Sequence, residues 1–580
     1  MADAMKLRGP DGWATWMDGT RRLGFAHRRL AILDPTARSD QPMITPDERY
    51  TIVFNGEIYN FHDVRSALEA RGHTFHTTGD TEVLLTSYRE YGERMVDHLR
   101  GMYAFAIWDA KERTLFFGRD PLGIKPLYYS LEQGILRFAS QVKTLRAVTQ
   151  DDRPDPAGQV GFFLWGSVPE PHTLYKAIRA LPPGHTMLAK QGSEPVIRRF
   201  ADVAQALADG AANRIDDPAE VKRILHDALR ESVEAHIISD VPVALFLSAG
   251  LDSCTIAALL NELPGVQLNA LTLGFDHMKD GPLDESAIAR EVASQYGIPC
   301  HQEYIGRASF SAEHDHLLHA MDQPTIDGVN VYFVSRLAHQ AGYKVALSGL
   351  GGDELFAGYS SFQEVPKTAT RLKPLAGMPA LGRGFRWMSA GVLKHFTSPK
   401  YAGVLEYGSS IEGAYLLRRS LYMPWELPSV LPVETVREGW KQLEPMARME
   451  RQLAPLAGSD SPNADRLRVS TLEMTQYMRN QLLRDADWAG MAHSLEIRVP
   501  LMDFRLIQQL APVLAGSNAP GKMDMALSPL HRLPPAVLDR KKTGFEVPVR
   551  EWLLEQNGQP RKGAERGLRG WSRHIMETFN

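Results

Sequence analysis

The chain has 580 residues, of which 44% are hydrophobic and 23% charged. These values are typical of a globular protein and exclude a disordered, collagen-like or coiled-coil chain. At roughly 100–200 residues per domain, the length predicts two to four domains. The 65 basic and 69 acidic side chains give a net charge of −4. No overall field therefore selects nucleic acid or an anionic membrane, and an anionic ligand must be held by local groups.

Cysteine usage and the N-terminal residues indicate the compartment. The two cysteines, Cys254 and Cys300, are too few for a disulfide framework or a four-cysteine zinc site. No apolar signal segment occurs at the N-terminus, and the longest apolar run, 241–247, is far shorter than the roughly 20 residues that span a membrane. These features predict a cytoplasmic protein with neither nucleic-acid nor membrane partners.

Short strands predominate in the first third of the chain. Residues 51–54, 105–108 and 115–118 are rich in β-forming residues. Apolar residues recur at three- and four-residue steps in 61–71 and 82–99, which predicts helices there. This region is expected to combine a sheet with helices.

A domain boundary is predicted at residues 200–220. This segment ends in Asp217-Pro218, a helix start with proline in the first position. Beyond it, helices and strands alternate, which predicts a parallel sheet with crossover helices. The predicted elements are helix 219–236, strand 243–247, helix 255–262, strand 268–274, helices 285–296, 312–321 and 332–341, and strand 344–347. Residues 364–488 have mainly helical patterns.

The first strand of this alternation leads into a loop of small residues, 248–253, with the sequence Ser-Ala-Gly-Leu-Asp-Ser. Small side chains allow backbone N–H groups to approach phosphate oxygens, and the following helix contributes the positive end of its dipole. Ser248 and Ser253 add hydroxyl donors, and Asp252 is placed to hold Mg²⁺. An ordinary capped turn between a strand and a helix is the alternative for this loop alone.

A second loop of the same kind follows the strand at 344–347. Residues 348–354 read Ser-Gly-Leu-Gly-Gly-Asp-Glu. Because the carboxyl ends of parallel strands meet at one edge of a sheet, Asp252 and Asp353 are expected to share one metal–triphosphate complex.

Two basic segments follow. In 540–545, Arg-Lys-Lys-Thr-Gly-Phe, Lys542 is placed to supply positive charge to a departing pyrophosphate, and a solvated basic turn is the alternative. Residues 516–523 nearly match a phosphate-binding P-loop. However, Met523 replaces the required hydroxyl residue and the preceding segment, 506–514, is predicted to be a helix, so a P-loop is rejected.

Together these motifs resemble the glutamine-hydrolysing asparagine synthetase family. The loop 248–253 is similar to the pyrophosphate loop of N-type ATP pyrophosphatases. Other motifs of the family's second half occur at 348–359, 491–500 and 540–545, and motifs of its glutaminase half at 8–11, 27–32, 55–60, 79–82 and 118–123. The resemblance implies a two-domain α/β protein. A truncated N-terminal-nucleophile (Ntn) glutaminase α+β sandwich is expected at 1–200, and a parallel α/β ATP-pyrophosphatase synthetase domain with a helical extension at 215–580.

The resemblance also implies roles for residues of the glutaminase half. Arg29 would pair with the α-carboxylate of glutamine, and Asp80 with the backbone of Glu57 would hold its α-amino group. Asn55 and Gly56 would form the oxyanion hole.

In the synthetase half, the resemblance implies an ATP site with Mg²⁺. Phe246, Leu273, Ser348 and Gly349 would contact the adenosine moiety, while Ser248, Gly250, Asp252, Ser253, Asp353 and Lys542 would form the pyrophosphate and metal site. Within that set, Asp252 and Asp353 are the expected metal ligands, and Asp353 and Lys542 the expected catalytic residues.

The chain departs from the family at the glutaminase nucleophile, which is a cysteine directly after the initiator methionine. Here Ala2 takes that position and no cysteine precedes Cys254, so glutaminase activity is not expected of the chain as given. A start assigned too far downstream is the favoured explanation, because the expected glutamine-holding residues are all retained. The alternative is a chain that takes free ammonia or another amine, as in the related β-lactam synthetases.

Two further departures lie in the synthetase half. Ala249 replaces a glycine, which requires a negative φ there. Leu350 stands where asparagine synthetases often carry a glutamate, and an apolar side chain can neither take a proton nor orient an ammonium group.

The sequence therefore predicts an ATP-dependent, amide-forming ligase of asparagine biosynthesis. Aspartate, ATP and glutamine or ammonia would give asparagine, AMP and pyrophosphate through an acyl-adenylate. ATP and Mg²⁺ are the expected cofactors, the partners are small-molecule substrates, and a homodimer is compatible with this reading. Two alternatives are a ligase acting on another carboxylate, such as a sugar acid or a natural-product intermediate, and a non-catalytic nucleotide- or glutamine-binding regulator.

Overall fold

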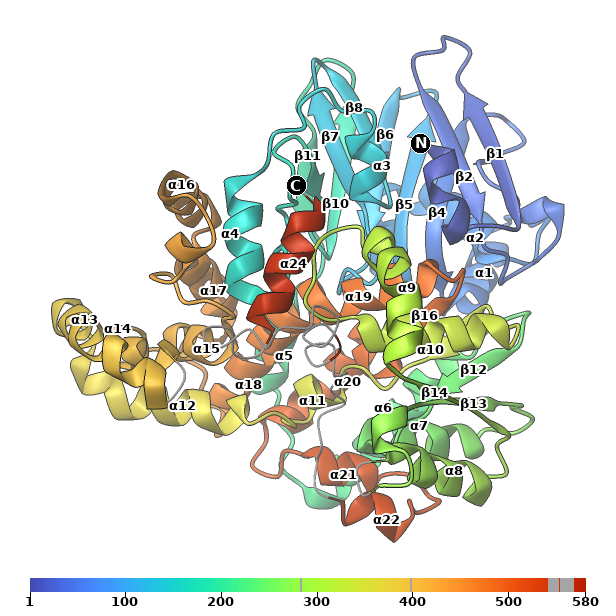
Figure 1. Ribbon diagram of the computed structural model, residues 1–580. Coiled ribbons are helices and arrows are strands. Elements are labelled where there is room, and N and C mark those ends of the chain that lie inside the picture. The colour runs from blue at the N-terminus through green and yellow to red at the C-terminus, as the bar shows by residue number, and fades with distance from the viewer. Residues whose placement is uncertain (282–283, 397–398, 541–551, 553–567, 580) are drawn as a thin grey trace.

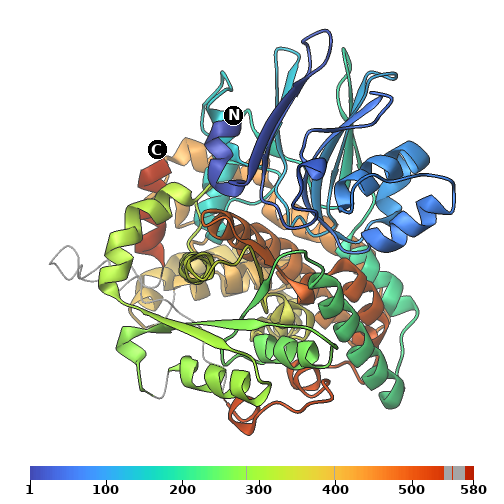
Figure 2. The same ribbon diagram turned by 90° about the vertical axis from the view of Figure 1, so that its right-hand side faces the viewer.

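A computed structural model describes residues 1–281, 284–396, 399–540, 552 and 568–579. Figures 1 and 2 show the first part of the chain, in blue to cyan, above the remainder in two perpendicular views. The architecture is that of a two-domain α/β protein. An antiparallel domain comes first and a parallel-sheet domain follows.

The first domain is built on a six-stranded antiparallel sheet of order β11-β10-β6-β5-β4-β3. Two smaller sheets, β1-β2 and β8-β7-β9, accompany it. The strands are β1 (Gly12–Met17), β2 (Gly24–Arg29), β3 (Met43–Ile44), β4 (Tyr50–Ile58), β5 (Gly101–Asp109), β6 (Thr114–Arg119), β7 (Tyr128–Glu132), β8 (Ile135–Ala139), β9 (Arg179–Ala180), β10 (His185–Lys190) and β11 (Val196–Arg199). The helices are α1 (Phe61–Glu69), α2 (Asp80–Tyr91), α3 (Val142–Arg146) and α4 (Pro156–Trp165).

Both faces of the central sheet are buried, because successive side chains of a strand point to opposite faces. On β4, Ile52 and Phe54 pack with residues of α1 and α2, whereas Val53 packs with residues of β2, β5, β6 and β10. The strands predicted at 51–54, 105–108 and 115–118 are confirmed within β4, β5 and β6. The helix predicted over 82–99 is shorter, because Gly92 takes a positive φ after Tyr91 and the chain continues as a 3₁₀ turn.

The second domain is built on a five-stranded parallel sheet of order β14-β13-β12-β15-β16. Its strands are β12 (Val243–Phe246), β13 (Asn269–Phe275), β14 (Cys300–Ile305), β15 (Val345–Leu347) and β16 (Glu496–Arg498). The predicted alternation is confirmed, but β14 and β16 had not been predicted. Residues 300–305 mix polar with apolar side chains, and β16 has only three residues.

Helices surround this sheet and form an extension beside it (Figure 1). Around the sheet lie α5 (Val203–Ala212), α6 (Pro218–His236), α7 (Leu251–Asn261), α8 (Glu285–Gln295), α9 (Arg307–Ala320), α10 (Val329–Gln340), α11 (Gly352–Leu355), α19 (Leu483–Met491), α20 (Phe504–Ala515), α21 (Lys522–Ala526) and α22 (Pro535–Leu538). The last described helix, α24 (Arg569–Phe579), lies beside α4 (Figure 1). The extension holds α12 (Ser361–Leu372), α13 (Pro379–Phe396), α14 (Val404–Tyr407), α15 (Ile411–Arg419), α16 (Val433–Leu443), α17 (Pro445–Leu453), α18 (Ala464–Leu472) and a π-helix (Glu473–Leu482). The predicted start of α6 is confirmed, since the carboxylate of Asp217 accepts from the Glu220 N–H at 2.8 Å.

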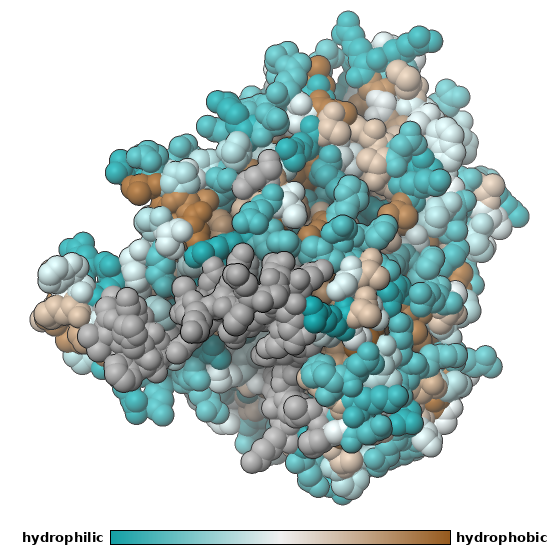
Figure 3. Space-filling view, viewed as in Figure 1, coloured by the Kyte–Doolittle hydropathy of each residue, from teal (hydrophilic) through white to brown (hydrophobic). Residues whose placement is uncertain are grey.

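The two domains share a continuous hydrophobic core. The cluster around the parallel sheet includes Ile32, Tyr59, Met102 and Ile124 of the first domain. On the face in Figure 3, the residues drawn in colour are mostly hydrophilic, and hydrophobic residues occur in separate groups. Within the described ranges, no helix is both long and apolar enough to cross a membrane.

Candidate functional site

The two small-residue loops lie side by side at the carboxyl edge of the parallel sheet. The first follows β12, and the second follows β15, which is paired with β12 in parallel. Gly349 of the second loop touches the first so closely that a Cβ atom there would lie 2.8 Å from the Ser253 nitrogen and 3.0 Å from the Asp252 Cβ. Glycine is therefore needed for the loops to make this contact.

Hydroxyl groups hold the first loop in shape. The Ser253 hydroxyl accepts from the Ser248 N–H at 3.1 Å, and the Ser248 hydroxyl accepts from the Gly250 N–H at 3.1 Å. Ala249 is absent from the described non-glycine residues with positive φ, so the conformation expected of it is confirmed. The predicted phosphate-binding residues thus form one tight strand-to-helix turn before α7.

One lysine joins the carboxylates of the two loops. The Nζ atom of Lys522, at the start of α21, forms an ion pair with Asp252, and a second with Asp353 at 2.9 Å. Lys522 lies in the segment that sequence reasoning rejected as a P-loop. That rejection is confirmed, because a helix precedes the segment, but the lysine itself was missed. Its partners lie 270 and 169 positions away, so no local pattern reveals the contact.

The lysine contact tests whether these carboxylates fit a metal ion. A single cationic nitrogen reaches both, so Asp252 and Asp353 converge on one point. Among the described residues, no group of three or more His, Cys, Asp or Glu side chains forms a metal site. Two converging carboxylates fit Mg²⁺, which usually takes its other ligands from phosphate oxygens and water.

Three further predicted residues of this half lie as follows. Phe246 ends β12 and is half-buried against the sheet's core. Leu273 on β13 is buried in a second hydrophobic cluster. Ser348 donates its N–H to the Arg498 carbonyl of β16 at 2.8 Å. Lys542 lies outside the described residues.

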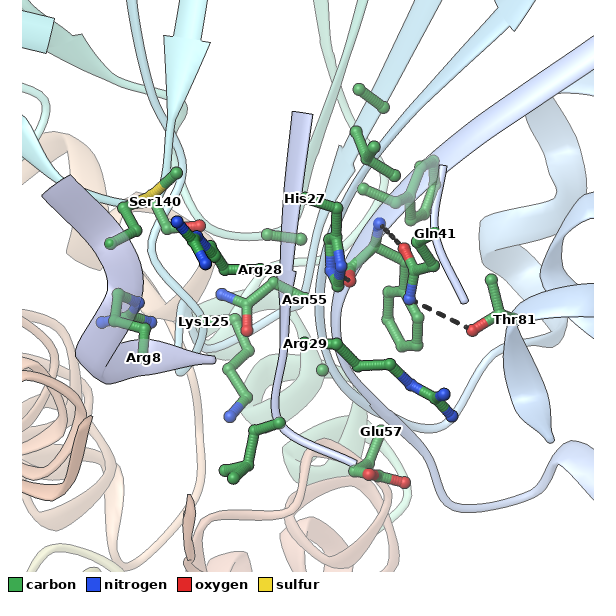
Figure 4. A pocket seen from close by; sticks show the side chains of 18 of the residues that line it. Arg8, His27, Arg28, Arg29, Gln41, Asn55, Glu57, Thr81, Lys125 and Ser140 are labelled. Carbon is green, nitrogen blue, oxygen red and sulfur yellow. Dashed lines mark hydrogen bonds between the residues drawn. The ribbon is translucent and has the colours of Figure 1, made fainter. Parts of the chain in front are cut away.

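The five predicted glutamine-binding residues line one cavity in the first domain. Its volume is about 150 Å³, and it is open to solvent on one side. Lining residues include Arg29, Asn55, Gly56, Glu57 and Asp80. Figure 4 shows the side chains of Asn55, Glu57 and Lys125 around this space. None of the residues that line it is a cysteine.

Asn55 and Gly56 occupy the end of β4 that faces the cavity. The Nδ2 atom of Asn55 is buried, and no hydrogen-bond acceptor for it is found among the described residues. Gly56 has a φ of +149°, and a Cβ atom there would lie 2.1 Å from the Met102 carbonyl oxygen. A buried amide donor without an acceptor among the described residues, next to a half-buried glycine of the same strand, is suited to receive an oxyanion.

Arg29 is already paired. Its Nη1 atom donates to the Thr36 carbonyl at 2.8 Å and to the Asp40 carboxylate at 2.9 Å, while Nη2 donates to the carbonyls of Leu33 and Asp34. Only Asp40 among these acceptors is a carboxylate, and half of its side chain is exposed. An incoming carboxylate would therefore compete with Asp40 for this guanidinium.

Asp80 begins α2, and its carboxylate accepts from the Ile58 N–H at 3.0 Å. Burial raises the pKa of Asp80 to about 7, against the lowering effect of this hydrogen bond. Removal of a carboxylate from water favours its neutral form. A cationic partner that binds near neutral pH would therefore favour the ionised form of the Asp80 carboxyl group.

Strand β16 connects the two sites, which the sequence did not reveal. Glu496 pairs with Lys125 of the first domain at 2.8 Å, and both side chains are buried. Arg498 is fully buried, pairs with Glu496 at 3.0 Å, and its Nη2 lies 3.6 Å from Glu57 Oε1. Since the Arg498 carbonyl also binds Ser348, one residue contacts both the glutamine-pocket candidate and the nucleotide-loop candidate.

Comparisons with known proteins cover nearly the whole chain. A family model described as "Glutamine amidotransferase domain" matches residues 1–200, and one described as "Asparagine synthase" matches residues 225–579. The chain is 32% identical to asparagine synthetase [glutamine-hydrolyzing] 1 of Bacillus subtilis, over 98% of this chain and 85% of that protein. It is 29% identical to asparagine synthetase [glutamine-hydrolyzing] 3 of the same organism, over 95% and 86%. Amidase chyE of Penicillium rubens is 30% identical, over 62% and 54%.

Proposed function

The chain belongs to the asparagine synthase family, and from that premise we propose that it converts aspartate to asparagine through an aspartyl-adenylate. Membership makes it an ATP-dependent, amide-forming carbon–nitrogen ligase. The observation that carries the finer proposal is the convergence of Asp252 and Asp353 on Lys522 beside two glycine-bearing loops. Such a cluster can hold a metal-bound triphosphate and stabilise charge on departing pyrophosphate.

In the proposed reaction, the first loop holds the pyrophosphate portion of ATP. Backbone N–H groups and the hydroxyls of Ser248 and Ser253 are the donors there. Mg²⁺ held by Asp252 and Asp353 would neutralise phosphate charge and polarise the phosphoryl oxygens. Lys522 would leave its carboxylate partners and place its ammonium group on the phosphates, together with Lys542.

The acceptor carboxylate attacks the α-phosphorus of ATP, which forms an acyl-adenylate and releases pyrophosphate. Ammonia then attacks the acyl carbon and displaces AMP. The ligase residues need only orient the acceptor and balance charge in the first step, because the driving force comes from the phosphoanhydride.

The first-domain cavity is proposed to bind glutamine. Arg29 would take the α-carboxylate in the position that Asp40 now holds, and ionised Asp80 would take the α-ammonium group. The Asn55 amide and the Gly56 backbone would face the side-chain carbonyl. Whether glutamine or free ammonia supplies the nitrogen is tested by comparing the two donors at saturating aspartate and ATP.

A different carboxylate is the second candidate, favoured by Leu350. This side chain packs against the core around the parallel sheet and carries no polar atom. Relatives of the chain also include a protein named as an amidase. The second candidate is therefore a ligase for another carboxylate, such as a sugar acid or a natural-product intermediate.

Exchange between ATP and labelled pyrophosphate tests both candidates. With aspartate and Mg²⁺ we expect exchange well above the control without acceptor, and asparagine on addition of ammonia. No exchange with aspartate, but exchange with another acid from a panel, would support the second candidate. ATP binding without exchange for any acid would instead favour the regulator.

A further inference from the structure

A small cavity between the domains adjoins the glutamine-pocket candidate, with which it shares Arg8 and Ser140, and half of the residues that line it are charged. Its volume is about 10 Å³, which is enough for one water-sized body. The charged residues that line it are Arg8, Arg119, Arg479, Arg484, Glu170, Asp322 and Asp487. Arg119 and Glu170 come from the first domain, whereas Arg479 on the π-helix and Arg484 on α19 come from the second.

Two of the arginines are fully engaged with carboxylates. Arg8 makes two parallel hydrogen bonds to Asp487 at 2.7 and 2.9 Å. Arg119 makes two to Glu170, both at 2.9 Å, and also donates to three backbone carbonyls. Bidentate pairs of this kind satisfy both partners.

The third carboxylate, Asp322, is bound by backbone groups. It accepts from the N–H groups of Val142 and Lys143 at 2.8 and 3.1 Å. Among the described residues, it forms no hydrogen bond or ion pair with the two remaining arginines, Arg479 and Arg484.

Arg484 is the unusual member of the cluster. Only 8% of the residue is exposed, and Nε, Nη1 and Nη2 are all buried with no hydrogen-bond acceptor among the described residues. Its carboxylate neighbour Glu170 has Oε1 3.9 Å from Nη2, which is too long for a hydrogen bond. A buried guanidinium without an acceptor is costly.

The charges around the cavity do not balance. Four arginines face three carboxylates, which leaves an excess of one positive charge. Arg479 also has its Nε buried without an acceptor in the described part of the chain. Burial, with the nearby charge of Arg479, lowers the pKa of Arg448 to about 10, and burial lowers the pKa of Arg479 as well. Both shifts indicate positive charge that is incompletely compensated.

We propose that this cavity binds one small monovalent anion, of the size and charge of chloride, through Arg484 and Arg479. A halide accepts several N–H groups at once and supplies the single negative charge that the lining lacks. Phosphate and other polyatomic anions are too large for the cavity, and a water molecule would satisfy donors without balancing the charge. This proposal does not depend on the proposed ligase reaction, which uses neither Arg479 nor Arg484.

Occupancy has a consequence for the domain interface. Arg119 belongs to the first domain and Arg479 with Arg484 to the second, so the uncompensated charge opposes their contact. A bound anion removes this repulsion. Chloride is therefore expected to stabilise the folded chain in a saturable way, because a ligand that binds only the native state shifts unfolding by mass action.

Thermal unfolding of the full chain in chloride and in gluconate, at equal ionic strength and pH, tests the site. Gluconate is too large to enter. We expect a saturable rise of the unfolding temperature of about 2 °C at 100 times the dissociation constant, with bromide acting like chloride. In crystals grown with bromide, an anomalous peak is expected beside the Arg484 guanidinium.

Replacement of the unpaired arginine provides the matched comparison. Arg484→Met keeps an unbranched apolar stem but removes the guanidinium group, so it should lose the chloride response. In gluconate it should unfold at the same or a higher temperature than the native chain, because a buried guanidinium without a hydrogen-bond acceptor among the described residues is gone. Arg437→Met, at an exposed position of α16, should keep the full response.

Several results would overturn the proposal. These are an equal chloride response in the native chain and Arg484→Met, or no difference between chloride and gluconate. A bromide peak in crystals without any response in solution would mean an adventitious ion only. The bromide peak requires no variant, so a misfolded Arg484→Met would leave the site still testable.

Discussion

Charged groups are held in opposite ways at the two candidate sites. In the first domain they line a preformed cavity of about 150 Å³, and the Asn55 amide has no acceptor among the described residues. In the second, Asp252 and Asp353 contact Lys522 directly. A ligand can enter the cavity while most contacts between the lining residues stay intact. A nucleotide, by contrast, must replace the existing ion pairs of Lys522 with contacts to its phosphates and metal ion. The first site is thus preorganised and the second is self-neutralised until the ligand arrives.

The connection between these sites gives the largest expected effect. Arg498→Met removes the partner of Glu496 and Glu57 inside the domain interface. We expect a loss of about 3–5 kcal/mol in the free energy of unfolding, since breaking a buried ion pair leaves uncompensated charge. Urea denaturation measures it.

Arg505→Met, at an exposed position of α20, is the control and should change stability by less than about 0.5 kcal/mol. A similarly small effect of Arg498→Met would show that β16 does not connect the sites energetically.

Substitution of Lys522 tests the site in the second domain. Lys522→Met should lower kcat/KM for ATP–pyrophosphate exchange by about 10²–10³, the usual cost of losing a group that stabilises transition-state charge. Lys522→Arg should restore part of it. Lys441→Met, exposed on α16, serves as the control. Unchanged exchange in Lys522→Met would limit this lysine to a structural role.

The pH dependence of stability tests the environment of Asp80 in the first-domain cavity. Asp80 has a folded-state pKa raised to about 7, above the value of about 3.9 in an unfolded chain. The folded state therefore holds a proton that the unfolded state has lost, and this contribution to stability declines as pH rises from about 4 to about 7. Asp80→Asn should lose this slope, so its stability relative to the native chain should improve between pH 5 and pH 8.

Glutamine binding should have the opposite pH dependence, because the ligand's ammonium group needs ionised Asp80. Calorimetric titration should find tighter binding as pH rises through about 7 in the native chain and a flat profile in Asp80→Asn. Parallel profiles in the two proteins would exclude Asp80 as the ammonium partner.

The smallest expected effect concerns the carboxylate that occupies Arg29. Asp40→Asn weakens a partly exposed ion pair, which is worth up to about 1 kcal/mol. Glutamine should then bind about two- to fivefold more tightly, as measured by titration. Asp47→Asn, whose carboxylate pairs with the exposed Arg89, is the matched control. Weaker binding in Asp40→Asn would contradict competition at Arg29.

Much of the fold could be predicted because its signals are local. Runs rich in β-forming residues predicted β4, β5 and β6, and the order of helices and strands predicted the parallel sheet. Strands β14 and β16 were missed. Neither has a clear strand pattern, because β14 mixes polar with apolar residues and β16 has only three residues. They form because neighbouring strands offer hydrogen-bond partners.

The candidate sites also combine features that are local in the sequence with features that depend on the folded chain. Their loop residues and glycines are consecutive in the chain, so the sequence alone determined which backbone segments could approach phosphate or an oxyanion. Which side chains meet there was decided by tertiary structure. Lys522 reaches Asp252 across 270 positions, and Arg498 reaches Glu57 across the domain interface. That the Arg484 guanidinium has no hydrogen-bond acceptor among the described residues also became visible only in the folded chain. Periodicity and turn chemistry act over a few residues, whereas charge pairing and burial depend on how distant segments pack.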